Sequence, residues 1–134
     1  MKLVRGTGKL EAKNFGKADE VRKFPKGKLE LVKVGGAEIG RATLEPGWSW
    51  AKSVKPIVKT KSCEAPHFQY HLSGTLKVVM DDGTEKLVKA GDISLVPPGH
   101  NAWVVGEEPV VVIDFQGMVD YAKASASKKS KKSN

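Results

Sequence analysis

The sequence predicts an all-β fold in a single domain, an antiparallel sandwich or barrel with two facing sheets. Short segments of alternating apolar and polar residues recur along the chain, and glycine or proline stands between nearly all of them. Alternation with a period of two is typical of strands, and short strands at this spacing are typical of sandwiches and barrels. The length of 134 residues fits one domain that buries a core of its own.

The first expected strands lie at 28–34 and 37–44, because the sequence KLELVKV alternates and a Gly-Gly pair follows it. An E-P-G turn at 45–47 ends the second strand and opens the sequence WSW. The segment 56–66 has a proline at each end, so we expect it to be irregular.

Six further strands are expected, at 68–72, 75–80, 84–88, 93–96, 102–105 and 110–115. The D-D-G sequence at 81–83 places a glycine where a hairpin needs a positive φ. The sequences A-G-D at 90–92 and P-P-G at 97–99 predict two more turns. The only helix that the pattern predicts is short and lies at 118–126.

The chain is expected to divide into an N-terminal arm with a strand at 1–27, a barrel at 28–117, and a short helix with a disordered lysine-rich tail at 118–134. The net charge is +8 at pH 7, and four of the lysines lie at 128–132. No hydrophobic residue follows Ala126, which is why the tail is expected to be disordered. Such a tail can tether a protein to nucleic acid. No aromatic or arginine pattern accompanies these lysines, so we favour a solubilising terminus and expect no nucleic-acid partner.

Composition also predicts the compartment. The chain has no run of the roughly 20 apolar residues that a membrane helix needs, and the residues after Met1 do not resemble a signal peptide. The single cysteine, Cys63, has no partner for an internal disulfide. We therefore expect a cytoplasmic protein without a membrane partner.

The thiol and imidazole side chains of the sequence all lie in one stretch of the chain. Cys63, His67, His71 and His100 are the only cysteine and the only histidines in the sequence. Thiolate and imidazole suit Zn²⁺, Fe²⁺, Ni²⁺ or Cu ions far better than Mg²⁺ or Ca²⁺. The alternative is that Cys63 is a small buried hydrophobic residue and that each histidine only makes a hydrogen bond.

From about position 40 to 115 the chain resembles the cupins. Cupins carry a first motif, G-x5-H-x-H-x3,4-E-x6-G, and a second motif, G-x5-P-x-G-x2-H-x3-N. Gly74 stands at the end of the first motif, and Gly91, Pro97 and Gly99 have the spacing of the second. A P-G-W sequence before the first motif and the D-D-G hairpin between the two also fit. The resemblance implies a small antiparallel β-barrel of jelly-roll type, a metal site inside it, and a homodimer.

The metal ligands of the family are not kept in this sequence. Counted from the motif glycines, the positions of the family's two histidines, its glutamate and its last histidine hold Lys61, Cys63, His67 and Ala102. None of these four is the family's residue type, so the resemblance implies a substituted set of ligands rather than the usual one.

Strand alternation extends this set. If His67 points into the barrel, Gln69 and His71 on the same strand do so too, and His100 shares a face with Ala102. We predict that Cys63, His67 and His100 bind a divalent transition metal and leave an open coordination position. The acid–base group is predicted to be His71 or Lys61. The predicted substrate contacts are Gln69, Trp48, Trp50 and Met80.

Three functions remain open at this point. The first is a metal-dependent enzyme that acts on a small polar molecule, and we name it first because the ligand-type side chains cluster. The second is a metal-free module that binds a sugar or a small organic acid in the same cavity. The third is a nucleic-acid-associated protein that uses the lysine tail. In each case a homodimer is expected, with the strand near 21–24 as the contact.

Overall fold

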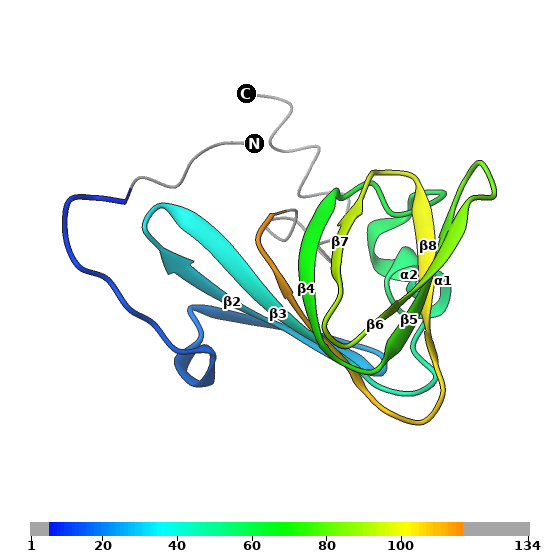
Figure 1. The fold of residues 1–134 in the computed structure, drawn as a ribbon, viewed down its shortest axis with the longest axis horizontal. Coiled ribbons are helices and arrows are strands. Elements are labelled where there is room, and N and C mark those ends of the chain that lie inside the picture. Colours follow the sequence, from blue (N-terminus) through cyan, green and yellow to red (C-terminus); the bar gives the residue numbers. More distant parts are fainter. Residues whose placement is uncertain (1–5, 117–134) are drawn as a thin grey trace.

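The computed structural model describes residues 6–116, which form two antiparallel sheets that face each other (Figure 1). One sheet has six strands in the order β1-β2-β3-β9-β4-β7, and the other has three in the order β6-β5-β8. The strands are β1 (Glu20–Phe24), β2 (Gly27–Val34), β3 (Ala37–Leu44), β4 (His67–Ser73), β5 (Thr75–Met80), β6 (Glu85–Lys89), β7 (Ile93–Val96), β8 (His100–Val105) and β9 (Val110–Asp114). All the predicted strands are confirmed to within two residues at each end, and the strand expected near 21–24 is β1.

The prediction of a closed barrel is wrong, because the two sheets do not join through strand pairs. Within residues 6–116, β7 pairs with β4 and β6 pairs with β5, and neither of these outer strands crosses to the facing sheet. On the other side, the free edge of β8 is met by two single bridges, Ser49 with Trp103 and Cys63 with His100. Loop residues thus occupy the edge that a closing strand would need, and the fold is a sandwich.

Two short helices that the sequence pattern did not predict follow the turn at 45–47: α1 (Trp50–Ser53) and α2 (Lys55–Val58). Helix α1 precedes the segment 56–66 that was expected to be irregular, and α2 extends into its start. The side chain of Ser49 caps α1 by accepting a hydrogen bond from the backbone N–H of Lys52. Pro56 lies in the first turn of α2, where a backbone N–H would have no partner within the helix, so the N–H that proline lacks is not needed. Trp50, Val54 and Val58 are buried at helical spacing, so packing against the sheets stabilises these helices.

A 3-10 turn, η1 (Phe15–Lys17), precedes β1. The helix predicted at 118–126 and the lysine-rich tail lie outside the described residues. Within the described part of the chain, no helix has the length and apolar character required to cross a membrane.

The core lies between the sheets. Leu29, Leu31, Val110 and Val112 are at most 1% exposed and cover the inner face of the larger sheet. Gly74 takes the chain from β4 in this sheet to β5 in the other with φ +78°, and a Cβ there would lie 2.5 Å from the carbonyl oxygen of Pro109. The first-motif glycine is therefore required by close packing where the chain changes sheets.

Candidate metal centre

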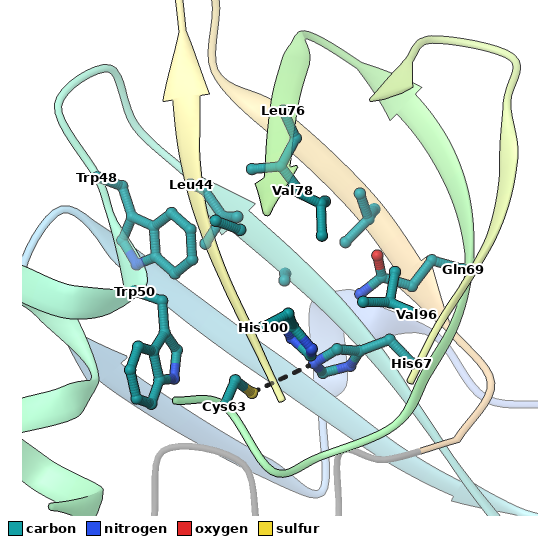
Figure 2. Close-up of a pocket in the computed structure, with 13 residues that line it drawn as sticks. Leu44, Trp48, Trp50, Cys63, His67, Gln69, Leu76, Val78, Val96 and His100 are labelled. Carbon is teal, nitrogen blue, oxygen red and sulfur yellow. Dashed lines mark hydrogen bonds between the residues drawn. The ribbon is translucent and has the colours of Figure 1, made fainter. Parts of the chain in front are cut away.

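Three side chains of metal-ligand type converge between the sheets (Figure 2). Cys63 lies in the loop before β4, His67 begins β4, and His100 begins β8. Their ligand atoms all lie within 4.8 Å of one another, and each residue is at most 5% exposed. The loop is held in place because the backbone N–H of Cys63 donates to the His100 carbonyl at 2.7 Å, and that of Gly99 donates to the Cys63 carbonyl at 2.7 Å. The cluster thus joins residues from both sheets.

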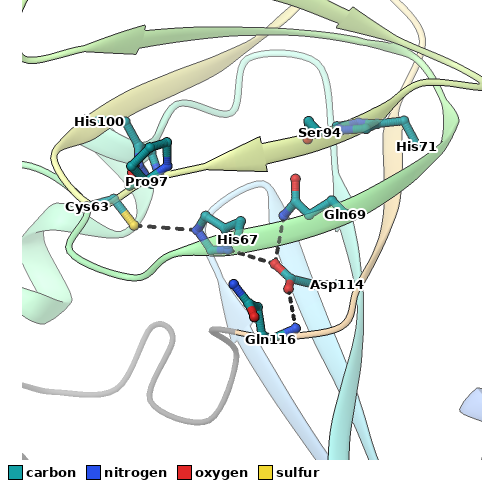
Figure 3. A network of polar contacts seen from close by, with 9 residues as sticks. All are labelled: Cys63, His67, Gln69, His71, Ser94, Pro97, His100, Asp114 and Gln116. Carbon is teal, nitrogen blue, oxygen red and sulfur yellow. Dashed lines mark hydrogen bonds and ion pairs between the residues drawn. The ribbon is translucent and has the colours of Figure 1, made fainter. Parts of the chain in front are cut away.

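The orientation of the His67 ring is set by Asp114, the last residue of β9. His67 Nδ1 donates to Asp114 Oδ2 at 2.7 Å (Figure 3). Since Nδ1 carries this hydrogen, Nε2 is the atom directed toward the cluster, and it lies 3.7 Å from Cys63 Sγ. A histidine that binds a metal through one ring nitrogen usually donates the other N–H to a carboxylate or carbonyl.

The His100 ring is oriented in the same way by the P-P-G turn that precedes β8. His100 Nδ1 donates to the backbone carbonyl of Pro97 at 2.7 Å, which directs Nε2 toward Cys63 and His67. The two imidazole rings meet edge to face, with centroids 5.2 Å apart. The turn residues of the second motif therefore place a carbonyl where it fixes a ligand histidine.

The electrostatics of the cluster favour a thiolate. Burial by itself raises the pKa of the Cys63 thiol, but hydrogen bonds from His100 and His67, together with their charges, lower it to about 6. Burial lowers the pKa of His67, but its hydrogen bonds to Asp114 and Cys63 and their negative charges raise it to about 9. In the metal-free protein near neutral pH, Cys63 and His67 therefore form a thiolate–imidazolium pair.

Asp114 is absent from the site residues predicted from the sequence, although it orients His67 in the cluster. It is completely buried and also accepts hydrogen bonds from Gln69 Nε2 at 2.9 Å and from the backbone N–H of Gln116 at 2.9 Å (Figure 3). A signal was available in the sequence, because Asp114 is the one acid in the apolar run VVVIDF and shares the inward face of Val110 and Val112.

The cluster borders a small cavity of about 40 Å³. Gln69 lines it, and because its Nε2 donates to Asp114, its Oε1 faces the cavity (Figure 2). Trp48 and Trp50 form one side, and Trp48 Nε1 is buried without a hydrogen-bond partner in the described part of the chain. The remaining lining residues are apolar: Ala42, Leu44, Leu76, Val78, Val96, Ala102 and Val112. Of the predicted substrate contacts, the structure thus places Gln69, Trp48 and Trp50 around the cavity.

Comparison with known proteins supports the architecture alone. No family model matches the sequence, and no curated protein matches it. Among solved structures, an RmlC-like cupin from Shewanella frigidimarina is 19% identical, with a TM-score of 0.56 over 83% of this chain and 95% of that one. The chain has a cupin-like fold. A protein of unknown function from Rhizobium leguminosarum, also 19% identical, has a TM-score of 0.55 over 81% of this chain and 98% of that one.

Within this cupin-like fold, the remaining predicted residues lie away from the cluster. His71 is buried farther along β4, where its Nε2 lies 2.9 Å from Ser94 Oγ (Figure 3). Burial lowers the pKa of His71 in spite of the negative charges of Asp92 and Asp114. Lys61 is exposed on the loop before Cys63. Met80 lines a different, larger pocket. Neither His71 nor Lys61 lines the cavity beside the cluster, so the structure gives no support for the acid–base role predicted for them.

Proposed function

We propose that Cys63, His67 and His100 bind a divalent transition-metal ion and that the protein is a metal-dependent enzyme acting on a small polar molecule. The observation that carries this proposal is the convergence of three buried ligand atoms within 4.8 Å. In a tetrahedral site with a metal–sulfur distance of about 2.3 Å and metal–nitrogen distances of about 2.0–2.1 Å, the sulfur and a nitrogen are about 3.6 Å apart. Cys63 Sγ and His67 Nε2 are 3.7 Å apart, so this pair fits such an ion with little movement.

The donor set suits Zn²⁺, Fe²⁺, Ni²⁺ or Cu ions, since it combines one thiolate with two imidazoles. Three protein ligands leave a coordination position for a substrate, and a bound ion would supply Lewis-acid polarisation of a substrate oxygen. Asp114 keeps the His67 ring in position and Pro97 does the same for His100. These hydrogen bonds reduce the reorganisation that metal binding requires.

The other cavity residues determine what can reach the cluster. A volume of about 40 Å³ admits only a very small molecule or group, because pockets for drug-sized ligands hold roughly 300–1,000 Å³. Gln69 Oε1 accepts a hydrogen bond from a hydroxyl or amino group that enters. The apolar lining keeps bulk water out, which strengthens electrostatic interactions inside. A whole sugar does not fit this cavity, so its size favours the metal site over a sugar-binding module.

The reactivity of Cys63 tests the proposal. In the metal-loaded protein we expect slow alkylation by iodoacetamide that becomes fast once a chelator is added, because a coordinated thiolate is shielded. In the metal-free protein, the alkylation rate is expected to rise with pH through an inflection near 6, since the pKa of Cys63 is lowered to about 6.

The His67→Gln variant serves as the control for the pH profile, because its inflection should move up toward the ordinary thiol value when the imidazolium is lost. Equal alkylation rates before and after metal removal would take Cys63 out of the site. An inflection near 9 in the unmodified protein would mean that Cys63 is not paired with His67.

We also propose that the protein is a homodimer. β1 lies at one edge of the six-stranded sheet, and Val21 in this strand is 51% exposed. An exposed apolar side chain on the outer strand of a sheet can pack against its counterpart in a second copy. Sedimentation at micromolar concentration is expected to show a dimer. The Val21→Asp variant is expected to shift the monomer–dimer equilibrium toward monomer. A monomer at this concentration in the unmodified protein would exclude the dimer and leave the fold unchanged.

A further inference from the structure

The cavity beside the cluster offers a ligand a hydrogen-bond acceptor. Gln69 lines this cavity from β4 and is 7% exposed. Its Nε2 donates to Asp114 Oδ2 at 2.9 Å, and because a carboxylate oxygen accepts, this contact decides which end of the side-chain amide is the N–H end. Oε1 is therefore the end that faces the cavity (Figure 2), and no donor within residues 6–116 reaches it. An acceptor on a buried side chain that has no partner indicates a ligand.

The acceptor at Gln69 selects ligands by hydrogen-bond type. A carbonyl oxygen accepts from an N–H or O–H group and has no hydrogen to donate. A carboxylate placed against it would bring two acceptors together and leave both without a partner, which is costly in a buried site. Gln69 cannot adapt by turning its amide over, because its N–H end is held by Asp114. The cavity therefore favours a ligand that donates a hydrogen bond at this point.

The charge balance of the cluster also disfavours an anion. With the proposed divalent ion bound, the Cys63 thiolate and the carboxylate of Asp114 offset its positive charge, and a histidine that binds a metal is neutral. Asp114 is completely buried, so its charge acts within the site. Among the other described residues that line the cavity, none outside the cluster carries a charge. An anionic ligand would leave an uncompensated negative charge in a buried site, whereas an uncharged ligand keeps the balance.

The size of the cavity limits the size of the ligand. One water-sized group needs roughly 10–15 Å³, so a cavity of about 40 Å³ accommodates about three non-hydrogen atoms. Apart from the cluster and Gln69, the walls are largely apolar and include Val78, Val112 and the rings of Trp48 and Trp50. The ligand therefore has its polar atoms at the cluster and at Gln69.

We propose that the ligand of this site is an uncharged molecule of about three non-hydrogen atoms that carries an oxygen lone pair and an N–H or O–H group, as in the smallest amides and alcohols, and that anions are rejected. The oxygen is directed to the open coordination position and the donor to Gln69 Oε1. This ligand class rests on the metal centre proposed above, and it narrows the substrate from any small polar molecule to one kind. Asp114 then has a second role besides orienting His67, because its charge decides which charge the ligand has.

Formamide and formate test this ligand class, because they share one skeleton and differ in charge and in the N–H group. The full-length protein is loaded with Co²⁺, whose visible absorption changes when a ligand enters its coordination shell, and each compound is titrated at neutral pH. Formamide is expected to bind, and formate is expected to bind more weakly by about tenfold or more. Uptake of Co²⁺ reports on the metal centre by itself, so failure of the metal site is distinguished from failure of ligand selection.

Asp114→Asn is expected to shift the preference toward formate. It removes the carboxylate and keeps the shape of the side chain, so at saturating Co²⁺ the site has an excess positive charge that an anion neutralises. The ratio of formate affinity to formamide affinity is expected to rise about tenfold relative to the unmodified protein. Asp92→Asn is the control, because Asp92 is exposed and its charge acts on His71, and it should leave the ratio unchanged.

Gln69→Met tests the acceptor, because methionine has a similar length and no carbonyl oxygen. At saturating Co²⁺ the affinity for formamide is expected to fall about threefold to tenfold, as loss of one hydrogen bond does, and the affinity for formate is expected not to fall. Gln116→Met is the matched control. It is the same substitution at a residue outside the cavity lining, and the contact of Gln116 with Asp114 is made by the backbone N–H, which the substitution keeps.

A preference for formamide that Asp114→Asn and Gln69→Met each reduce would support the proposed class. Formate that binds the unmodified protein as tightly as formamide, an affinity ratio unchanged by Asp114→Asn, or equal effects of Gln69→Met and Gln116→Met would each overturn it. Protein that takes up no Co²⁺ would overturn the metal centre together with the ligand class.

Discussion

Replacing any one of the three ligands is expected to abolish stoichiometric metal binding. The variants are Cys63→Ala, His67→Gln and His100→Gln. Each leaves only two ligands in a cluster whose ligand atoms lie within 4.8 Å, and two ligands do not make the three-residue set of a catalytic zinc site. Metal content is measured by elemental analysis of protein purified without a histidine tag, after reconstitution with Zn²⁺ or Fe²⁺.

His71→Gln is the matched control for this experiment. It is the same substitution as His67→Gln, on the same strand and in a buried position, but His71 contacts Ser94 and not the cluster. We expect it to keep one metal ion per chain. Thermal unfolding of each variant separates loss of a ligand from loss of the fold. Metal retained by His67→Gln, or lost equally by His71→Gln, would contradict the assignment of the ligands.

The second large effect is expected from Asp114→Asn, which removes a charge and keeps the shape of the side chain. Loss of a carboxylate that orients a ligand histidine typically lowers metal affinity by about 10–100-fold. The pKa of His67, raised to about 9 with Asp114 as one cause, should fall toward its ordinary value. Affinity is measured by competition with a coloured chelator, and the pKa by NMR titration of the imidazole in the metal-free protein.

Asp92→Asn is the control for Asp114→Asn. Asp92 is an exposed acid whose charge acts on His71, so its loss should leave the pKa of His67 and the metal affinity unchanged. If Asp114→Asn bound metal as tightly as the unmodified protein and left the pKa of His67 near 9, Asp114 would have a structural role only.

The strands could be predicted because their signals are local. Alternating residues and the glycines and prolines between them depend on neighbours in the chain, and the hairpin at 81–83 is one example. No local sequence signal decides whether the two sheets close into a barrel, because closure depends on which strand edges meet across the sheets. The bridge between Cys63 and His100 at the edge of β8 has no counterpart in the alternation pattern. Helices α1 and α2 are short, and tertiary contacts of Trp50 and Val54 decide their formation.

The ligand set could be predicted in part, because motif spacing and strand alternation are also local signals. Cys63 and His67 were found by counting from motif glycines, and His100 by strand parity. Strand parity also predicted that His71 faces the interior, and His71 is buried as expected. It lies four residues beyond His67, however, which is about 13 Å along a strand at a rise of about 3.3 Å per residue. Asp114 is 47 residues from His67 in the chain, and only the pairing of β4 with β9 brings the two together.

The most direct test of the metal centre is X-ray absorption at the edge of whichever transition metal the protein holds when it is purified without a histidine tag. We expect one sulfur ligand at about 2.3 Å and two nitrogen ligands at about 2.0–2.1 Å, from Cys63, His67 and His100. A coordination shell without sulfur, or protein that takes up no transition metal even after reconstitution, would contradict the proposed function.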